Sequence, residues 1–195
     1  MTAATGSVRD TLLRMRGVWH DTLHAFHPDG TPMHHDEVGS VHGPFPYDNL
    51  VYIDVDGDVY RQTNVTFRGR PTKVRSFEAH IVDGVLRFAT LGPDDPGHVG
   101  VSAGPGRLIF CPTTTDHPGL SRYSEPDFVE LTGPGTRQRT TMLYRGGELV
   151  RTLAVSGVRL AATADHRVPD DPRGPDGPVH EPASTTSAFT GGTDG

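Results

Sequence analysis

The stretch that decides the fold is Phe128-Val129-Glu130-Leu131-Thr132, Gly133-Pro134-Gly135, a run from Thr136 to Arg145, Gly146-Gly147, and a run from Glu148 to Leu160. The first run has the pattern of a short β-strand, which the Gly-Pro-Gly triplet ends. The glycine pair supplies the two positive φ angles of a tight hairpin, so the two longer runs are expected to pair as antiparallel strands. One face of the last strand would carry Leu149, Arg151, Leu153 and Val155, and the other Val150, Thr152, Ala154 and Ser156. Since neither face is fully polar, both are expected to be covered, as in a barrel or a sandwich.

The same alternation extends back through the chain. Runs of strand-forming residues separated by breaks rich in Gly, Pro and Asp predict about ten strands in all. Besides those above, we expect strands at residues 18–26, 33–42, 49–55, 59–67, 73–82, 85–91 and 107–111. Asp56-Gly57 and Asp83-Gly84 are tight-turn signals, and the helical crossovers that a parallel sheet needs are absent. The predicted fold class is all-β, an antiparallel up-and-down barrel of about 8–10 strands.

The two ends of the chain are expected to lie outside this barrel. Val8, Leu12 and Met15 have near-helical spacing and predict a short helix within residues 1–16. The barrel domain is assigned to residues 17–163, and residues 164–195, rich in Pro, Gly and Asp, are predicted to be a disordered tail. Two long loops, Gly92 to Gly106 and Pro112 to Pro126, are interpreted as lids, binding loops or simply mobile segments.

Composition excludes several classes of protein. The 195 residues, 34% of them hydrophobic, suffice for one sizeable core, and a net charge of −6 leaves no basic surface for nucleic acid. The single cysteine, Cys111, excludes an internal disulfide framework and fits a reducing compartment. No run approaches the ~20 apolar residues of a membrane span. We therefore expect a cytoplasmic protein whose partner is a small molecule, neither nucleic acid nor membrane; a homodimer is one option for an oligomeric state that the sequence does not fix.

Two patterns resemble a known fold family. The opening Gly17-Val18-Trp19, followed by a strand and by Phe26-His27-Pro28-Asp29-Gly30, resembles the Gly-x-Trp start of lipocalin-like (calycin) barrels. The closing pattern resembles the C-terminal half of a bacterial lipocalin-like family of unassigned function. It consists of Phe128-Val129-Glu130-Leu131, Arg137-Gln138-Arg139, Tyr144-Arg145-Gly146-Gly147-Glu148-Leu149 and Leu153 to Arg159. The resemblance implies a barrel with a ligand cavity and brings no catalytic residues with it. Members of the wider group bind hydrophobic ligands, haem or bilins, and some unrelated small barrels act as cyclases without a cofactor.

Histidines are concentrated near the start of the chain. Six of the 11 lie between His20 and His42, and alternation in a strand would put His34 with Asp36, or His35 with Glu37, about 7 Å apart on one face. Such a pair could share a proton or a metal, but a metal needs a third ligand, such as His24 or His80, that the spacing does not demand. Haem is disfavoured, because nitrobindin-like barrels take a late histidine ligand and the last strand here has none. We expect no metal and no cofactor.

Two arginines occupy positions that alternate with apolar residues along a predicted strand. Arg75 alternates with Phe77, Ala79 and Ile81, and Arg151 alternates with the apolar residues of the last strand. A guanidinium on such a face must be paired or reach water. These two arginines therefore hold an anionic oxygen of a ligand in the barrel, form structural bridges with glutamates, or lie on faces that point outward.

Five further side chains are assigned to the wall of the cavity: Trp19, His24, Tyr52, Tyr60 and Tyr144. Tyrosines can donate to a ligand carbonyl, although they are also common in half-buried strands. Trp19 is expected to close one end of the barrel and to pack on an arginine.

These residues support two main hypotheses. The first is a cofactor-independent cyclase or isomerase of bacterial secondary metabolism, in which the cavity fixes one substrate conformer. Its catalytic residues would be Arg75 and Arg151, which polarise a carbonyl or hold an anion, and His35 with Glu37, which move a proton. The alternative is a non-catalytic carrier or sensor of lipocalin type. A metal-dependent enzyme is a third interpretation.

Overall fold

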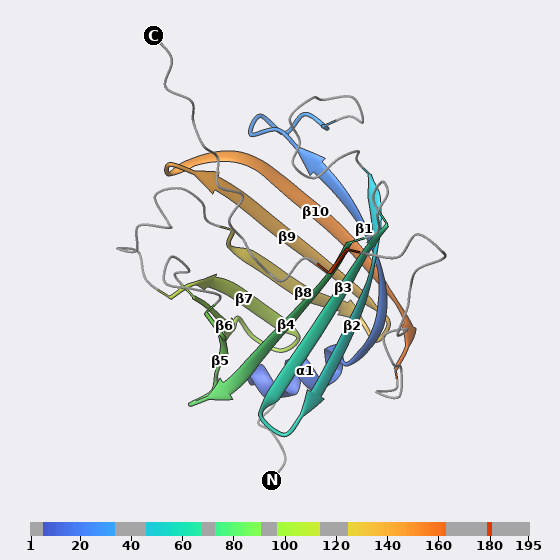
Figure 1. The fold of residues 1–195 in the computed structure, drawn as a ribbon, viewed down its shortest axis with the longest axis vertical. Helices are drawn as coiled ribbons and strands as arrows, with labels where there is room; N and C mark the ends of the chain where they lie inside the picture. Colours follow the sequence, from blue (N-terminus) through green and yellow to red (C-terminus); the bar gives the residue numbers. More distant parts are fainter. Residues whose placement is uncertain are drawn as a thin grey trace.

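The computed structural model describes residues 6–33, 46–67, 73–90, 97–113, 125–162 and 179–180. One short helix and eleven strands lie within these ranges (Figure 1). Their bounds are α1 Val8–Met15, β1 Gly17–Phe26, β2 Tyr47–Asp56, β3 Val59–Phe67, β4 Lys73–Val82, β5 Val85–Phe88, β6 His98–Ser102, β7 Arg107–Pro112, β8 Asp127–Gly133, β9 Thr136–Arg145, β10 Glu148–Ala161 and β11 Val179–His180.

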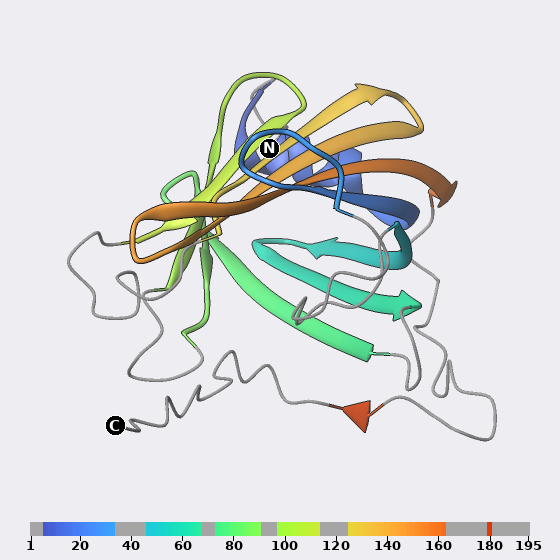
Figure 2. The same cartoon turned by 90° about the horizontal axis from the view of Figure 1, so that it is seen from above.

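Strands β1 to β10 form a closed antiparallel barrel. Each strand pairs with its neighbour in sequence, and β1 also pairs with β10, so the ring closes. Seen from above, β2, β3 and β4 form one wall, and β9 and β10 form the wall opposite (Figure 2). The eleventh strand, β11, lies outside the ring and pairs in parallel with the start of β4. The prediction of an antiparallel up-and-down barrel is confirmed.

Register identifies the side chains that face the barrel interior. Trp19 lies opposite Val51 on β2 and Arg159 on β10, and alternation then assigns every second residue of each strand to the same side. On β1, this inward set includes Asp21, Leu23 and Ala25, all of which are buried. Residues of the other phase, such as His20 and His24, are exposed.

Helix α1 closes one end of the barrel. Ser7 caps it by accepting a hydrogen bond from the Asp10 backbone N–H at 3.1 Å, and Asp10 lies in the first turn, where a negative charge suits the helix dipole. Its buried face packs into one core cluster with side chains from β1, β2, β3, β4, β5, β7 and β8. Trp19 is 0% exposed in this cluster, and its indole N–H donates to the Met15 carbonyl at 2.7 Å.

The Gly17-Val18-Trp19 start has a steric cause at its glycine. Gly17 has φ of +128°, and a Cβ there would lie 2.2 Å from the Ala161 carbonyl oxygen. Only glycine therefore lets the chain turn from α1 into β1 while β10 passes alongside.

Most predicted elements match the structure, and one does not. The helix at Val8–Met15 and the hairpin at Gly146-Gly147 are confirmed, and both glycines have positive φ. The loop assigned to Gly92 to Gly106 is wrong in part, because it contains β6. That strand is only five residues long and has Gly100 at its centre, where a Cβ would meet Phe110 Cε1 at 3.0 Å.

Other predictions lie largely outside the described residues. These are the strand at 33–42, apart from Met33, most of the loop from Pro112 to Pro126, and the predicted tail, apart from β11. Within the ranges that are described, no helix is long and apolar enough to cross a membrane.

Candidate functional site

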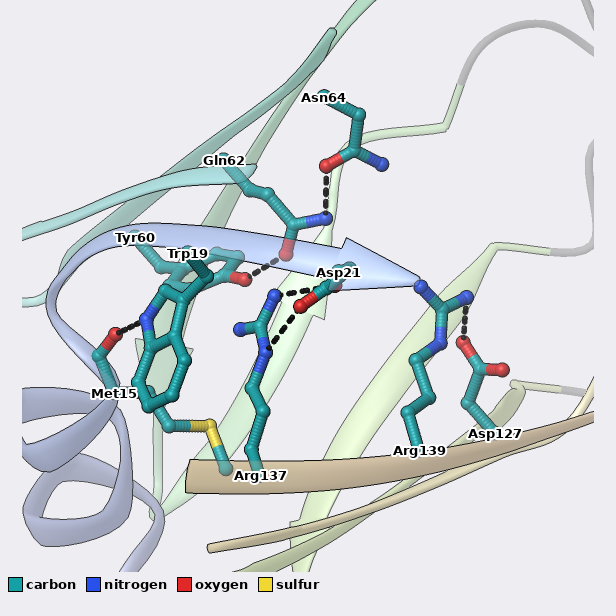
Figure 3. Close-up of polar contacts among 9 residues, drawn as sticks. All are labelled: Met15, Trp19, Asp21, Tyr60, Gln62, Asn64, Asp127, Arg137 and Arg139. Atoms are coloured by element: carbon teal, nitrogen blue, oxygen red, sulfur yellow. Dashed lines mark hydrogen bonds and ion pairs between the residues drawn. The ribbon is translucent and has the colours of Figure 1, made fainter. Parts of the chain in front are cut away.

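The interior of the barrel carries charged and amide side chains above the closed end. They come mainly from β1, β3, β8, β9 and β10, and Figure 3 shows those of β1, β3, β8 and β9. Three arginines of β9 and β10 belong to this set, and each faces a carboxylate. The pairs are Arg137 with Asp21, Arg139 with Asp127, and Arg151 with Glu125.

The deepest pair joins β9 to β1 across the intervening strand β10. Arg137 donates from Nε to Asp21 Oδ1 at 3.1 Å and from Nη2 to Oδ2 at 2.7 Å, and both side chains are buried. Gly157 of β10 is the register partner of both residues. A Cβ at Gly157 would lie 2.3 Å from Asp21 Oδ1, so glycine is what lets the ion pair pass over the β10 backbone.

This pair rests on the closed end. The guanidinium carbons of Arg137 and Arg159 each lie 4.6 Å from the centroid of the Trp19 ring. Arg159 also donates to the Arg14 carbonyl. Burial lowers the pKa of Arg159, and the like charge of Arg137 lowers it further. The prediction that Trp19 closes the barrel and packs on an arginine is confirmed.

The second pair lies farther from the end of the barrel that α1 closes. Arg139 donates from Nη2 to Asp127 Oδ2 at 2.7 Å. Burial by itself would lower the pKa of Arg139, but the charge and hydrogen bond of Asp127, with a further contribution from Glu125, outweigh it and raise the pKa above its ordinary value. Arg139 therefore stays charged and held by its carboxylate.

The third pair is looser. Arg151 is buried on β10, and its Nη2 lies 3.9 Å from Glu125 Oε1. Glu125 also contributes to the pKa of Arg139, so it lies within electrostatic reach of two of the interior arginines.

A chain of hydrogen bonds runs along the inner face of β3. The Tyr60 hydroxyl donates to Gln62 Oε1, and Gln62 Nε2 donates to Asn64 Oδ1 at 2.8 Å. Because each residue of this series donates to the next, the series ends at Asn64, whose amide N–H groups are donors. Burial raises the pKa of Tyr60, and the charges of both ion pairs of β9 act on it, so β3 and β9 face the same space.

Several interior polar atoms have unused hydrogen-bonding capacity. Asn49 Oδ1, Asp127 Oδ1, Arg139 Nε and Thr141 Oγ1 are shielded from solvent and make no hydrogen bond within the described part of the chain. Thr141 and Asp127 are register partners on β9 and β8, so three of the four atoms lie together. Because a buried polar atom without a partner is costly, such a cluster is typical of a site that a ligand or water completes.

The structure separates the residues that the sequence assigned to the site. Arg151 and Tyr60 face the interior and are buried, whereas Arg75, although on the inward phase of β4, is exposed. Trp19 belongs to the closed end. His35 and Glu37 lie outside the described residues.

Three assigned wall residues are on the outer face. His24 is exposed and lies opposite Ala154, which is also exposed. Tyr52 and Tyr144 are half-buried, and the first lies opposite Val18 and the second opposite Leu149. Their strands place them one residue out of phase with the interior, so they do not line it.

The sequence interpretation missed most of the interior polar residues. Asp21 alternates with Trp19, Leu23 and Ala25, and a carboxylate in that apolar phase was a usable signal. Arg137 and Arg139 gave no such signal, because their inward neighbour Thr141 is itself polar. Asp21 and Arg137 are 116 residues apart in sequence, so only the closure of the barrel brings them together.

Comparison with known proteins supports the fold. No protein-family model and no curated protein matches this chain. A protein of unknown function of the DUF3598 family from Nostoc punctiforme matches with a TM-score of 0.58 and 18% identity, over 76% of this chain and 49% of that one. The chain thus spans about half the length of the Nostoc protein.

Two further solved structures are similar. The S-type phycobiliprotein lyase CPES from Guillardia theta matches with a TM-score of 0.56 and 11% identity, over 78% of this chain and 92% of the lyase. Lipid binding protein 8 from Caenorhabditis elegans matches with a TM-score of 0.41 and 14% identity, over 80% and 99% of the two chains. The matches to the Nostoc protein and the lyase show that the chain has the lipocalin-like (calycin) barrel fold, as the sequence predicts.

Proposed function

We propose that this protein binds a small molecule inside the barrel, above the end that α1 closes. One observation carries the proposal: inward-facing polar side chains stay partly open to solvent although the strands around them form a closed ring. Arg139 keeps 30% of its side-chain surface accessible and Asp127 keeps 17%, whereas Trp19 at the closed end keeps none. Gln62 and Asn64 on the opposite wall are also only half-buried.

The gradient of exposure indicates a space that opens away from α1. If the interior were packed solid, these side chains would be as inaccessible as Leu86 and Leu108, which lie at the closed end with no exposed surface. Pockets in the mouths of barrels, lined by apolar walls and a few polar groups, are common small-molecule sites. The fold is shared with a phycobiliprotein lyase, which is compatible with such a use.

Filling the interior tests this proposal. Asn64→Trp would add a large ring on the inner face of β3, whereas Thr63→Trp, at the neighbouring residue, would add the same ring on the outer face. We expect Nile red, an uncharged fluorescent probe, to bind the wild-type protein and the Thr63→Trp variant, and to bind Asn64→Trp at least about tenfold more weakly. Equal binding to the two variants would place the probe outside the barrel and contradict the proposal.

A second proposal is catalysis, as a cofactor-independent cyclase or isomerase. The observation that favours it is the Asp127 carboxylate, which keeps one oxygen without a hydrogen bond in the described structure beside the Arg139 guanidinium. A carboxylate can accept a proton while the adjacent cation stabilises an oxyanion. Arg151 would assist from β10, and roles for Arg75, His35 and Glu37 remain part of this proposal.

Mass spectrometry distinguishes binding from catalysis. Compounds that co-purify with the protein would be extracted, identified, and incubated again with fresh protein. A carrier returns the compound unchanged, whereas an isomerase or cyclase converts it to a product of the same mass with a different retention time. Conversion that is undiminished in Arg151→Ala and Asp127→Asn variants would remove those two residues from the mechanism.

A further inference from the structure

The charges inside the barrel restrict the class of ligand. Within the described residues, Arg137, Arg139 and Arg151 face Asp21, Asp127 and Glu125, so the three interior arginines are matched by three carboxylates. Arg159 lies at the closed end on Trp19, and Arg75 is exposed. Among the described residues, the interior above the closed end therefore offers no solvent-shielded arginine without a facing acid.

A ligand carboxylate would meet a carboxylate beside each of these guanidinium groups. Next to Arg139 it would lie near both Asp127 and Glu125, the two acids that already raise the pKa of Arg139. Like charges repel strongly where water is scarce. The arginines are thus arranged to orient hydrogen bonds and are not free to neutralise an incoming anion.

In the described part of the structure, the interior atoms that make no hydrogen bond include both donors and acceptors. Asp127 Oδ1 and Asn49 Oδ1 are acceptors, Arg139 Nε is a donor, and Thr141 Oγ1 can act as either. On the opposite wall, the chain from Tyr60 through Gln62 leaves the Asn64 amide N–H groups as donors. A purely apolar molecule would leave this hydrogen-bonding capacity unmet, which is costly for those atoms that are shielded from water.

We propose that the ligand is an uncharged polar molecule that carries a hydrogen-bond donor beside an acceptor, such as an amide, a lactam or a phenol next to a carbonyl. Its donor pairs with Asp127, and its acceptor pairs with Arg139 or Asn64. This inference rests on the proposed function, since it names the class of molecule that the same interior binds.

Three naphthalene probes of similar size test the inference by displacement of Nile red. They are naphthalene-2-carboxamide, which has a donor and an acceptor, 2-naphthoate, which is anionic, and 2-ethylnaphthalene, which is apolar. We expect the carboxamide to bind the wild-type protein at least about tenfold more tightly than either of the others. In Asp127→Asn, which leaves Arg139 without its carboxylate, the preference should shift toward 2-naphthoate by a similar factor.

The matched control is Glu130→Gln. Glu130 lies on the same strand as Asp127 and accepts from Arg107 at 2.7 Å, but on the outer face, so its loss should leave the order of the three probes unchanged. If Asp127→Asn does not fold, as judged by circular dichroism, the order of the three probe affinities for the wild-type protein tests the inference by itself.

The outcomes separate this inference from the proposed function. Tighter binding of 2-naphthoate, or equal binding of the carboxamide and 2-ethylnaphthalene, overturns the inference while interior binding stands. Nile red that is displaced by none of the three, yet responds to Asn64→Trp, also overturns the inference alone. Failure of Nile red to distinguish Asn64→Trp from Thr63→Trp overturns both.

Discussion

At the scale of single residues, Gly157 is the position on which the interior depends most directly. The Asp21–Arg137 pair crosses β10 at this residue, and a methyl group there would overlap Asp21 Oδ1 and press on Arg137 Cγ, at 2.8 Å. Both charged groups are buried, so separating them leaves each without its partner in a poorly hydrated place.

We therefore expect Gly157→Ala to lower the free energy of unfolding by roughly 3–5 kcal/mol, the usual cost of breaking a buried ion pair. Denaturant titration followed by circular dichroism measures this. The matched control is Gly135→Ala, because a Cβ at Gly135 meets nothing within 4 Å, and it should change the free energy by no more than about 0.5 kcal/mol. Similar losses in the two variants would show that the steric overlap is relieved at little cost.

A second residue-scale prediction concerns Tyr60. Burial raises its pKa above the ordinary value of 10.0, so above that pH the unfolded chain loses the phenolic proton while the folded protein keeps it. The unfolded state then binds fewer protons, and the free energy of unfolding should fall by up to about 1.4 kcal/mol per pH unit. Tyr60→Phe lacks this contribution.

The measurement is urea denaturation of both proteins between pH 8 and pH 11. The two stability curves should run parallel below pH 10, with Tyr60→Phe lower by about 1 kcal/mol for the lost hydrogen bond to Gln62, and should converge above it. Since all other titrating groups are common to both proteins, curves that stay parallel to the highest pH would exclude a buried, protonated Tyr60.

At the scale of elements, α1 determines which end of the barrel is closed. Leu12 is 1% exposed within the core cluster, while its neighbour Leu13 is 46% exposed on the opposite side of the helix. Leu12→Ala should cost about 2–5 kcal/mol, because it leaves a cavity under Trp19 and its neighbours. Leu13→Ala should lie within about 0.5 kcal/mol of the wild type. Thermal and denaturant unfolding of this adjacent pair measures how much the closed end contributes, and equal losses would mean that α1 does not pack as described.

The elements also show what could be predicted from the sequence. β3, β4 and β9 are runs of strand-forming residues between strong breakers, and their predicted bounds agree with the structure. β6 was missed because Gly100, needed for the approach of Phe110, weakens the strand signal that the pattern depends on. Alternation gave the phase of each strand but not which phase faces inward, so His24, Tyr52 and Tyr144 were assigned to the interior when they lie outside it. The partner of Arg137, Asp21, could be located only after barrel closure had joined β10 to β1.

At the scale of the whole molecule, the strands of the barrel pair over very different lengths. β9 and β10 pair along nearly their full lengths, from Arg145 opposite Glu148 to Thr136 opposite Val158. β5 and β6 pair only at Leu86 with Gly100 and at Arg87 with Val99. The closing contact between β4 and β5 is confined to the end of β4, and within the described residues the first half of β4 is paired on that side only by β11, at Lys73 and Val74. The ring is therefore expected to open locally at the β4–β5–β6 side, which would give a second route to the interior besides the end away from α1.

Native-state hydrogen exchange tests this whole-molecule prediction. Amides of β5 and β6 should exchange through local opening, with rates that depend little on added denaturant, because few hydrogen bonds and little buried surface are lost in that event. Amides of β9 and β10 should exchange only when the whole barrel unfolds, with a steep dependence on denaturant. A ligand that binds inside the barrel equally well whether this side is open or closed would slow exchange in β9 and β10 but leave β5 and β6 unchanged, because only global unfolding then releases it. A ligand that cannot stay bound when this side opens should slow both sets by the same factor. Protection of β5 and β6 equal to that of β9 and β10 in the free protein would show that the ring opens as one unit, and entry would have to occur at the end away from α1.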